Sequence, residues 1–111
     1  MKICVNRNKL MKAVNKSDNY CPITGNVNIA FKKKNATYNE IIVGKISVPC
    51  LIEGECEGFI LNYKHLRKAV KSCEGTSITI TDTAITDGGR DEVVFKSDLY
   101  EFSCMIFKRP L

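Results

Sequence analysis

The stretch VNRNKLMKAV at residues 5–14 recurs as LNYKHLRKAV at residues 61–70, at an offset of 56 in a chain of 111 residues. The identical pairs are Asn6/Asn62, Leu10/Leu66, Lys12/Lys68, Ala13/Ala69 and Val14/Val70. Self-similarity on this scale is typical of a duplicated supersecondary unit. The residues also leave open a chance similarity between two amphipathic helices.

Each of the two similar segments, 5–14 and 61–70, predicts the end of a strand followed directly by a helix. Asn6 and Asn62 are strong N-cap residues, because an asparagine side chain accepts a hydrogen bond from a free backbone N–H. The apolar residues that follow recur at helical spacing. They are Leu10, Ala13 and Val14, with Ser17 more loosely, in the first copy, and Leu66, Ala69, Val70 and Cys73 in the second. We predict strands at 2–6 and 59–61, helices at 7–17 and 63–73, and a helix stop at Gly75.

Strand patterns fill the rest of each half. Val27, Ile29 and Phe31 alternate with more polar residues, which predicts a half-buried strand ending in a hairpin at 32–36. Residues 40–52 predict two strands interrupted at Gly44 and Pro49, followed by an acidic loop at 53–58. Further strands are predicted at 77–81, 93–96 and 100–107, with a turn at 87–89. Each half therefore reads strand, helix and about three strands, as pseudo-repeats 1–58 and 59–111.

Length and composition are those of one globular domain spanning 1–111. Apolar residues make up 44% and charged residues 26%, and no apolar run is long enough to span a membrane. The N-terminus lacks the pattern of a secretory signal, so we expect a cytoplasmic protein. The six cysteines form no C-x-x-C pair and the single histidine is His65, so we expect reduced, core-filling cysteines, no metal site and no cofactor.

Positive charge is concentrated in the two predicted helices. Residues 7–17 and 63–73 hold eight of the 17 basic residues and none of the 12 acidic ones, so the rest of the chain is mildly acidic. The candidate site residues are Lys9, Lys12, Lys16, Lys64, Arg67, Lys68 and Lys71. Within each helix their spacing places them on one face, opposite the apolar residues.

A helix face of a single sign forgoes the opposite-charge pairs that stabilise solvated helices. Binding of a polyanion would compensate, since the summed field attracts it and its counterions are released. Lysines at this density contact phosphates and carry little sequence information, and no aromatic series suits single-strand stacking. The pattern favours duplex DNA backbone; the alternative is an ordinary lysine-rich solvated face.

No constellation of an enzyme is evident. His65 lies among basic residues on the predicted polar face, and no serine or cysteine is paired with it as a nucleophile. The glutamates at 53, 55 and 57 read as an exposed acidic turn. We therefore assign no catalytic residue.

The chain resembles the bacterial DNA polymerase III beta subunit, the DNA sliding clamp. Its opening, MKICVNRNKLMKAV at 1–14, is similar to the first strand and helix of that family, and PITGNV at 22–27 is similar to the family's Pro-Ile-Leu-x-Asn segment, with Thr24 in place of leucine. The segment FILN at 59–62 with the second basic helix, then Gly75 and residues 77–81, resemble the middle of a clamp domain. The resemblance runs over nearly the whole chain.

This resemblance implies an α+β fold: a duplicated β-α-β-β-β unit with two helices packed on antiparallel sheet. It implies that the helices face duplex DNA, which assigns DNA contacts to the seven basic residues named above. Family members carry three such domains per chain and close a six-domain ring as a dimer. A ring built from this chain would need about six copies joined edge to edge. Because the family's peptide-binding pocket lies between domains, none of its residues is carried over.

Two functions follow as expectations. The first is a DNA replication processivity factor that binds duplex DNA without sequence preference, self-associates as a ring or dimer, and works with a DNA polymerase or clamp loader. The second is a clamp-like interaction module, such as a phage or plasmid adaptor, decoy or inhibitor, acting on host replication proteins.

Overall fold

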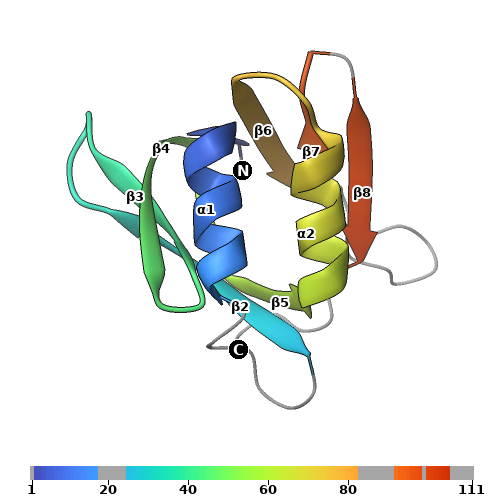
Figure 1. Ribbon diagram of the computed structural model, residues 1–111. Helices are drawn as coiled ribbons and strands as arrows, with labels where there is room; N and C mark the ends of the chain where they lie inside the picture. Colours follow the sequence, from blue (N-terminus) through green and yellow to red (C-terminus); the bar gives the residue numbers. More distant parts are fainter. Residues whose placement is uncertain (1, 18–24, 83–91, 99, 106–111) are drawn as a thin grey trace, which may run out of the picture.

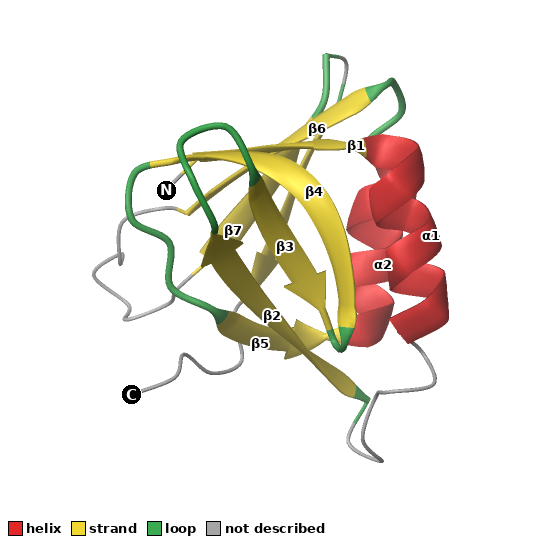
Figure 2. Cartoon of the chain, turned by 90° about the vertical axis from the view of Figure 1, so that its left-hand side faces the viewer, coloured by secondary structure: helices red, strands yellow, loops and turns green. Residues whose placement is uncertain are grey.

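Two helices lie side by side on one side of a strongly curved antiparallel sheet (Figures 1 and 2). The computed structural model describes residues 2–17, 25–82, 92–98 and 100–105. The elements in chain order are β1 (Lys2–Asn6), α1 (Arg7–Ser17), β2 (Asn26–Lys33), β3 (Asn39–Val43), β4 (Ile46–Glu53), β5 (Phe59–Asn62), α2 (Tyr63–Ser72), β6 (Ser77–Asp82), β7 (Glu92–Lys96) and β8 (Glu101–Met105).

The described strands form one sheet in the order β5-β2-β3-β4-β1-β6-β7-β8, with every neighbouring pair antiparallel. The α+β fold expected from the sequence is confirmed. Within these residues β5 pairs only with β2 and β8 only with β7, so these two strands stand at the edges of the sheet.

The core fills the space between the helices and the sheet. Both predicted inward stripes are buried, including Ser17, which is fully buried. The largest side chains that they meet from the sheet are Ile3, Ile29, Ile41, Phe59, Leu61, Ile78, Ile80 and Phe95. Burying a side chain of this size contributes roughly 1.5–3 kcal/mol relative to exposure. The stripes therefore fix which face of each helix turns to the sheet.

Asparagine caps both helices, as the sequence predicted. The Lys9 N–H donates to Asn6 Oδ1 at 2.9 Å, and the His65 N–H donates to Asn62 Oδ1 at 3.2 Å. Each cap is also the last residue of a strand, so no loop separates β1 from α1 or β5 from α2. Each helix therefore starts at a position set by its strand.

A second backbone contact fixes each of these junctions. The Arg7 N–H donates to the Thr76 carbonyl, and the Tyr63 N–H donates to the Gly25 carbonyl, both at 2.9 Å. Thr76 directly precedes β6 and Gly25 directly precedes β2. The first residue of each helix is thus tied to the residue before the strand that follows the other helix, and these two hydrogen bonds connect the two halves of the chain.

Two boundary predictions were wrong. Pro49 lies inside β4 rather than interrupting it, because the β1–β4 ladder starts at Cys50, one residue beyond the proline. The second helix ends at Ser72, and its C-cap is Cys73, whose N–H donates to the Ala69 carbonyl at 3.1 Å. Gly75 has a positive φ of 128° but lies beyond this cap.

The 87–89 turn, the start of the 22–27 segment and the end of the 100–107 strand lie outside the described residues.

We expect Asn62→Ala to lower the free energy of unfolding by about 1 kcal/mol, because it removes the acceptor for the His65 N–H. Urea denaturation followed by circular dichroism measures this loss. The matched control is Asn15→Ala, at an exposed position inside α1, which should leave stability unchanged or slightly raised. Equal stability of wild type and Asn62→Ala would contradict the role of the cap.

Candidate nucleic-acid interface

The outward face of α2 is mostly cationic, and the imidazole of His65 and the phenol of Tyr63 accompany the four cations. Lys64, Arg67, Lys68 and Lys71 are all exposed and line a shallow hollow of about 490 Å³ together with Tyr63. No acidic residue lies in α2. This helix therefore presents four positive charges within three turns, at a surface open to a large ligand.

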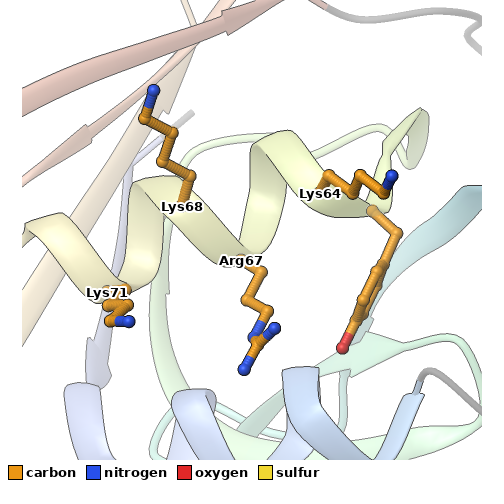
Figure 3. A pocket seen from close by; sticks show the side chains of 5 residues that line it. Lys64, Arg67, Lys68 and Lys71 are labelled. Carbon is orange, nitrogen blue, oxygen red and sulfur yellow. The ribbon is translucent and has the colours of Figure 1, made fainter.

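The cationic side chains spread to both sides of the helix (Figure 3). Arg67 extends toward α1, drawn in blue, whereas Lys68 extends to the opposite side. A single small anion would touch only part of this set. The spread instead suits an extended anionic surface that covers the whole helix face.

The three α1 candidates form a separate group. Lys9, Lys12 and Lys16 are exposed, and they line a groove of about 190 Å³ between α1 and β4. The other residues of this groove are Ala13, Ile46, Ser47, Val48 and Pro49. The lysines of α1 thus stand beside a partly apolar strand, on a different surface hollow from the cations of α2.

Helix stability does not account for this placement of charge. Lys16 and Lys71 in the last turns interact favourably with the helix dipole, but Lys9 and Lys64 lie in first turns, where a cation is unfavourable. Neither helix has an acidic residue in its first turn. The positive faces carry a modest cost in the isolated domain, which an anionic partner would relieve.

Arg7 joins the two helices. Its Nη2 donates to the Lys71 carbonyl at 3.1 Å, linking the start of α1 to the end of α2, so the helices run in opposite directions (Figure 1). Its Nε is buried and has no hydrogen-bond partner in the structure. This guanidinium is a packing element between the helices rather than part of either exposed cationic face.

The seven predicted residues are thus all exposed and all on the two helices, but in two groups rather than one. Their role in DNA binding stays a prediction. Tyr63 was not among the predicted contact residues, although its position four residues before Arg67 places both on neighbouring turns of one helix. The apolar wall of the α1 groove comes from β4 and could be found only once the strand was placed beside the helix.

The thiols occupy the core and its margin. Cys50 and Cys73 are buried, as predicted, while Cys4 and Cys56 are half-buried. Burial raises the pKa of Cys50 to about 11, with a smaller contribution from neighbouring Cys56, and burial also raises the pKa of Cys73. Both thiols are therefore protonated near neutral pH and unsuited to act as nucleophiles.

The described residues contain neither a metal-binding group nor a membrane-spanning helix. Over residues 2–17, 25–82, 92–98 and 100–105, no group of three or more His, Cys, Asp or Glu side chains is arranged to hold a metal ion. His65 is exposed on α2, as predicted from its basic surroundings. In that same part of the chain, no helix is both long and apolar enough to cross a membrane.

Comparison with known proteins gives a structural match without a sequence match. No protein-family model matches the sequence, and no curated protein matches it by sequence either. The fold is similar to the crystal structure of the beta subunit from DNA polymerase of Streptococcus pyogenes, with a TM-score of 0.71 and 14% identity. The match covers 100% of this chain and 33% of that chain, so this chain spans about a third of its length. The likeness shows a clamp-like fold.

We expect the Cys50 thiol to be alkylated by iodoacetamide at pH 8 about 100-fold more slowly in the folded protein than in the unfolded chain, because its raised pKa leaves little thiolate. Pulsed alkylation read by peptide mass spectrometry measures both rates. The folded-state rate should climb as the pH approaches the pKa of about 11. Equal rates in the two states at pH 8 would show that the thiol is not protected.

Proposed function

We propose that this protein is a sliding-clamp-like processivity factor that binds duplex DNA without sequence preference. The observation that carries the proposal is the pair of acid-free helices whose exposed sides bear seven cations, on one side of a clamp-like fold. The structural likeness to a DNA polymerase beta subunit supports the same function. The proposed contacts are Lys9, Lys12, Lys16, Lys64, Arg67, Lys68 and Lys71.

We infer that the domain is a duplicated β-α-β-β-β unit. The two capping asparagines are 56 residues apart, and so are Arg7 and Tyr63, which open the helices with equivalent backbone contacts. The ladders also agree, because Asn6 pairs with the first residue of β6 and Asn62 with the first residue of β2. Duplication explains why two basic helices occupy related positions on one side of the sheet.

Lysine and arginine side chains on a helix face contact phosphates, and such contacts position a protein on DNA without reading its sequence. The face of α2 is the stronger candidate, because its cations stand clear of any strand residue in their hollow. The spread from Arg67 to Lys68 allows contact with more than one phosphate. A protein that slides needs this kind of contact, since no single base sequence then holds it in place.

We further propose that copies of this chain assemble into a ring. The edge strands β5 and β8 each pair with one described neighbour, which leaves backbone groups on their outer sides for another chain. About six copies joined through such edges would close a ring of single-domain subunits. A DNA polymerase or clamp loader would then act on the assembled ring.

The same edges favour a second candidate function. A strand from a different protein could extend the sheet at β5 or β8, which is a recurring mode of peptide recognition. The chain would then be a clamp-like interaction module, such as a phage or plasmid adaptor, decoy or inhibitor of replication proteins. The state of assembly separates the two candidates.

We expect duplexes of unrelated sequence to bind with equal affinity, and log Kobs to fall linearly with log salt concentration. Lys64→Gln/Lys68→Gln should reduce the size of that slope by about 2, because two phosphate contacts are lost. Fluorescence anisotropy over a salt series measures this. The matched control is Lys2→Gln/Lys96→Gln, two exposed lysines on β1 and β7, which should leave the slope unchanged. An affinity that does not depend on salt would overturn the DNA proposal.

We expect a mass of about six chains in solution if edge-to-edge closure forms a ring. Light scattering on a sizing column, at micromolar to tens of micromolar protein, measures the mass. A mass of one or two chains would exclude encirclement of DNA by this chain alone and favour the interaction module.

A further inference from the structure

The α1–β4 groove combines positive charge with an apolar wall. Three ammonium groups, from Lys9, Lys12 and Lys16, follow one side of it. Ala13 and the β4 residues from Ile46 to Pro49 supply the other side. Within the groove β4 pairs with β3 on one side only, because the β1–β4 ladder begins at Cys50, so an occupant would meet the side chains of Ile46–Pro49 and the side of β4 that faces α1. This chemistry fits an acidic segment that also carries an apolar side chain.

The chain itself presents such a segment. We call it the acidic ridge: Leu51, Glu53, Glu55 and Glu57, all of them exposed. Alternate residues point the other way, since Ile52 and Cys56 are partly buried against the core. The Lys33 ammonium donates to the Gly54 carbonyl and ties the ridge to the end of β2. Leu51 is 60% exposed, the most exposed large apolar side chain among the described residues.

The two surfaces match in length and charge. Lys9 and Lys16 are seven residue steps apart in α1, about 10 Å along the helix axis. Glu53 and Glu57 are four residue steps apart, at most about 13 Å in an extended chain. Three ammonium groups thus face three carboxylates over similar distances, and Leu51 can meet the exposed Pro49 and the half-buried Ile46.

We propose that the α1–β4 groove of one copy binds the acidic ridge of a second copy. Because every copy carries both surfaces, each copy can both give and receive the contact, either head to tail along a series of copies or reciprocally in a twofold dimer. It goes beyond the proposed DNA function and does not depend on the edge strands, and a copy whose groove is occupied keeps only the α2 cations for DNA. The cationic face of α2 takes no part in this contact.

Exposed ion pairs are individually weak and are screened by salt, so the association is a low-affinity one. Sedimentation velocity over a concentration series measures it, with the same series repeated at high salt as a check on its electrostatic part. Lys12→Glu/Lys16→Glu reverses the groove, and Glu55→Lys/Glu57→Lys reverses the ridge. Each double variant alone should weaken self-association at least tenfold. An equimolar mixture of the two should restore it, because each reversed surface meets its complement.

Matched controls separate this contact from general charge effects. Lys64→Glu/Lys71→Glu on α2 and Glu74→Lys after α2 alter exposed charges outside both surfaces and should leave self-association unchanged. Leu51→Ser should weaken it at both salt concentrations, because it removes an apolar contact that salt does not screen. All these positions are exposed, and far-ultraviolet circular dichroism verifies that each variant is folded.

Restoration in the mixture supports the proposal whatever the DNA affinity. A wild-type protein that stays monomeric throughout the series overturns it. So does an unchanged mass in the two reversed variants, which would assign any assembly to the sheet edges. Loss in both variants without restoration in the mixture also overturns it, and leaves the groove to an acidic segment of a different protein.

Discussion

The burial of two narrow apolar stripes against one face of a single sheet determines where everything else in this protein lies. Leu10 and Val14 in α1, and Leu66 and Val70 in α2, are at most 1% exposed. A helix that commits such a stripe to the core must turn its opposite side to solvent. Both basic faces consequently point outward. Burial of the apolar stripes places them there, not an attraction of the lysines and arginine to acidic groups of the same domain.

The direct passage from strand to helix makes this arrangement rigid. Asn6 and Asn62 each end a strand and cap a helix, so the backbone hydrogen bonds of the sheet also set where each helix begins. Arg7 then connects the opposite ends of the helix pair through the Lys71 carbonyl. Charged groups on a scaffold fixed in this way keep their spacing, which favours repeated contact with a regular polyanion over capture of one small anion.

The two halves are alike in backbone and unlike in surface. At the aligned positions 11 and 67, α1 has a methionine partly buried against the core and α2 has an exposed arginine. Charge in α1 is therefore shifted toward β4, where it borders apolar residues, while charge in α2 covers the whole outward side. A domain with two related helices can in this way present one face suited to phosphates and one groove suited to an acidic, partly apolar segment.

The sequence by itself determined the two helices, their caps, their inward residues and the identity of the exposed cations, because caps and helical periodicity are local properties of neighbouring residues. Two boundaries predicted from the sequence were wrong because contacts with other strands or residues decided them. Pro49 stays within β4, since the β1–β4 ladder starts just after it, and α2 ends before Gly75. Only the tertiary structure decided the order of the strands, the split of the seven cations into two groups, and the pairing of Lys9, Lys12 and Lys16 with β4. Those features depend on contacts between residues far apart in the chain, and no pattern within one segment encodes which strand will lie beside a given helix.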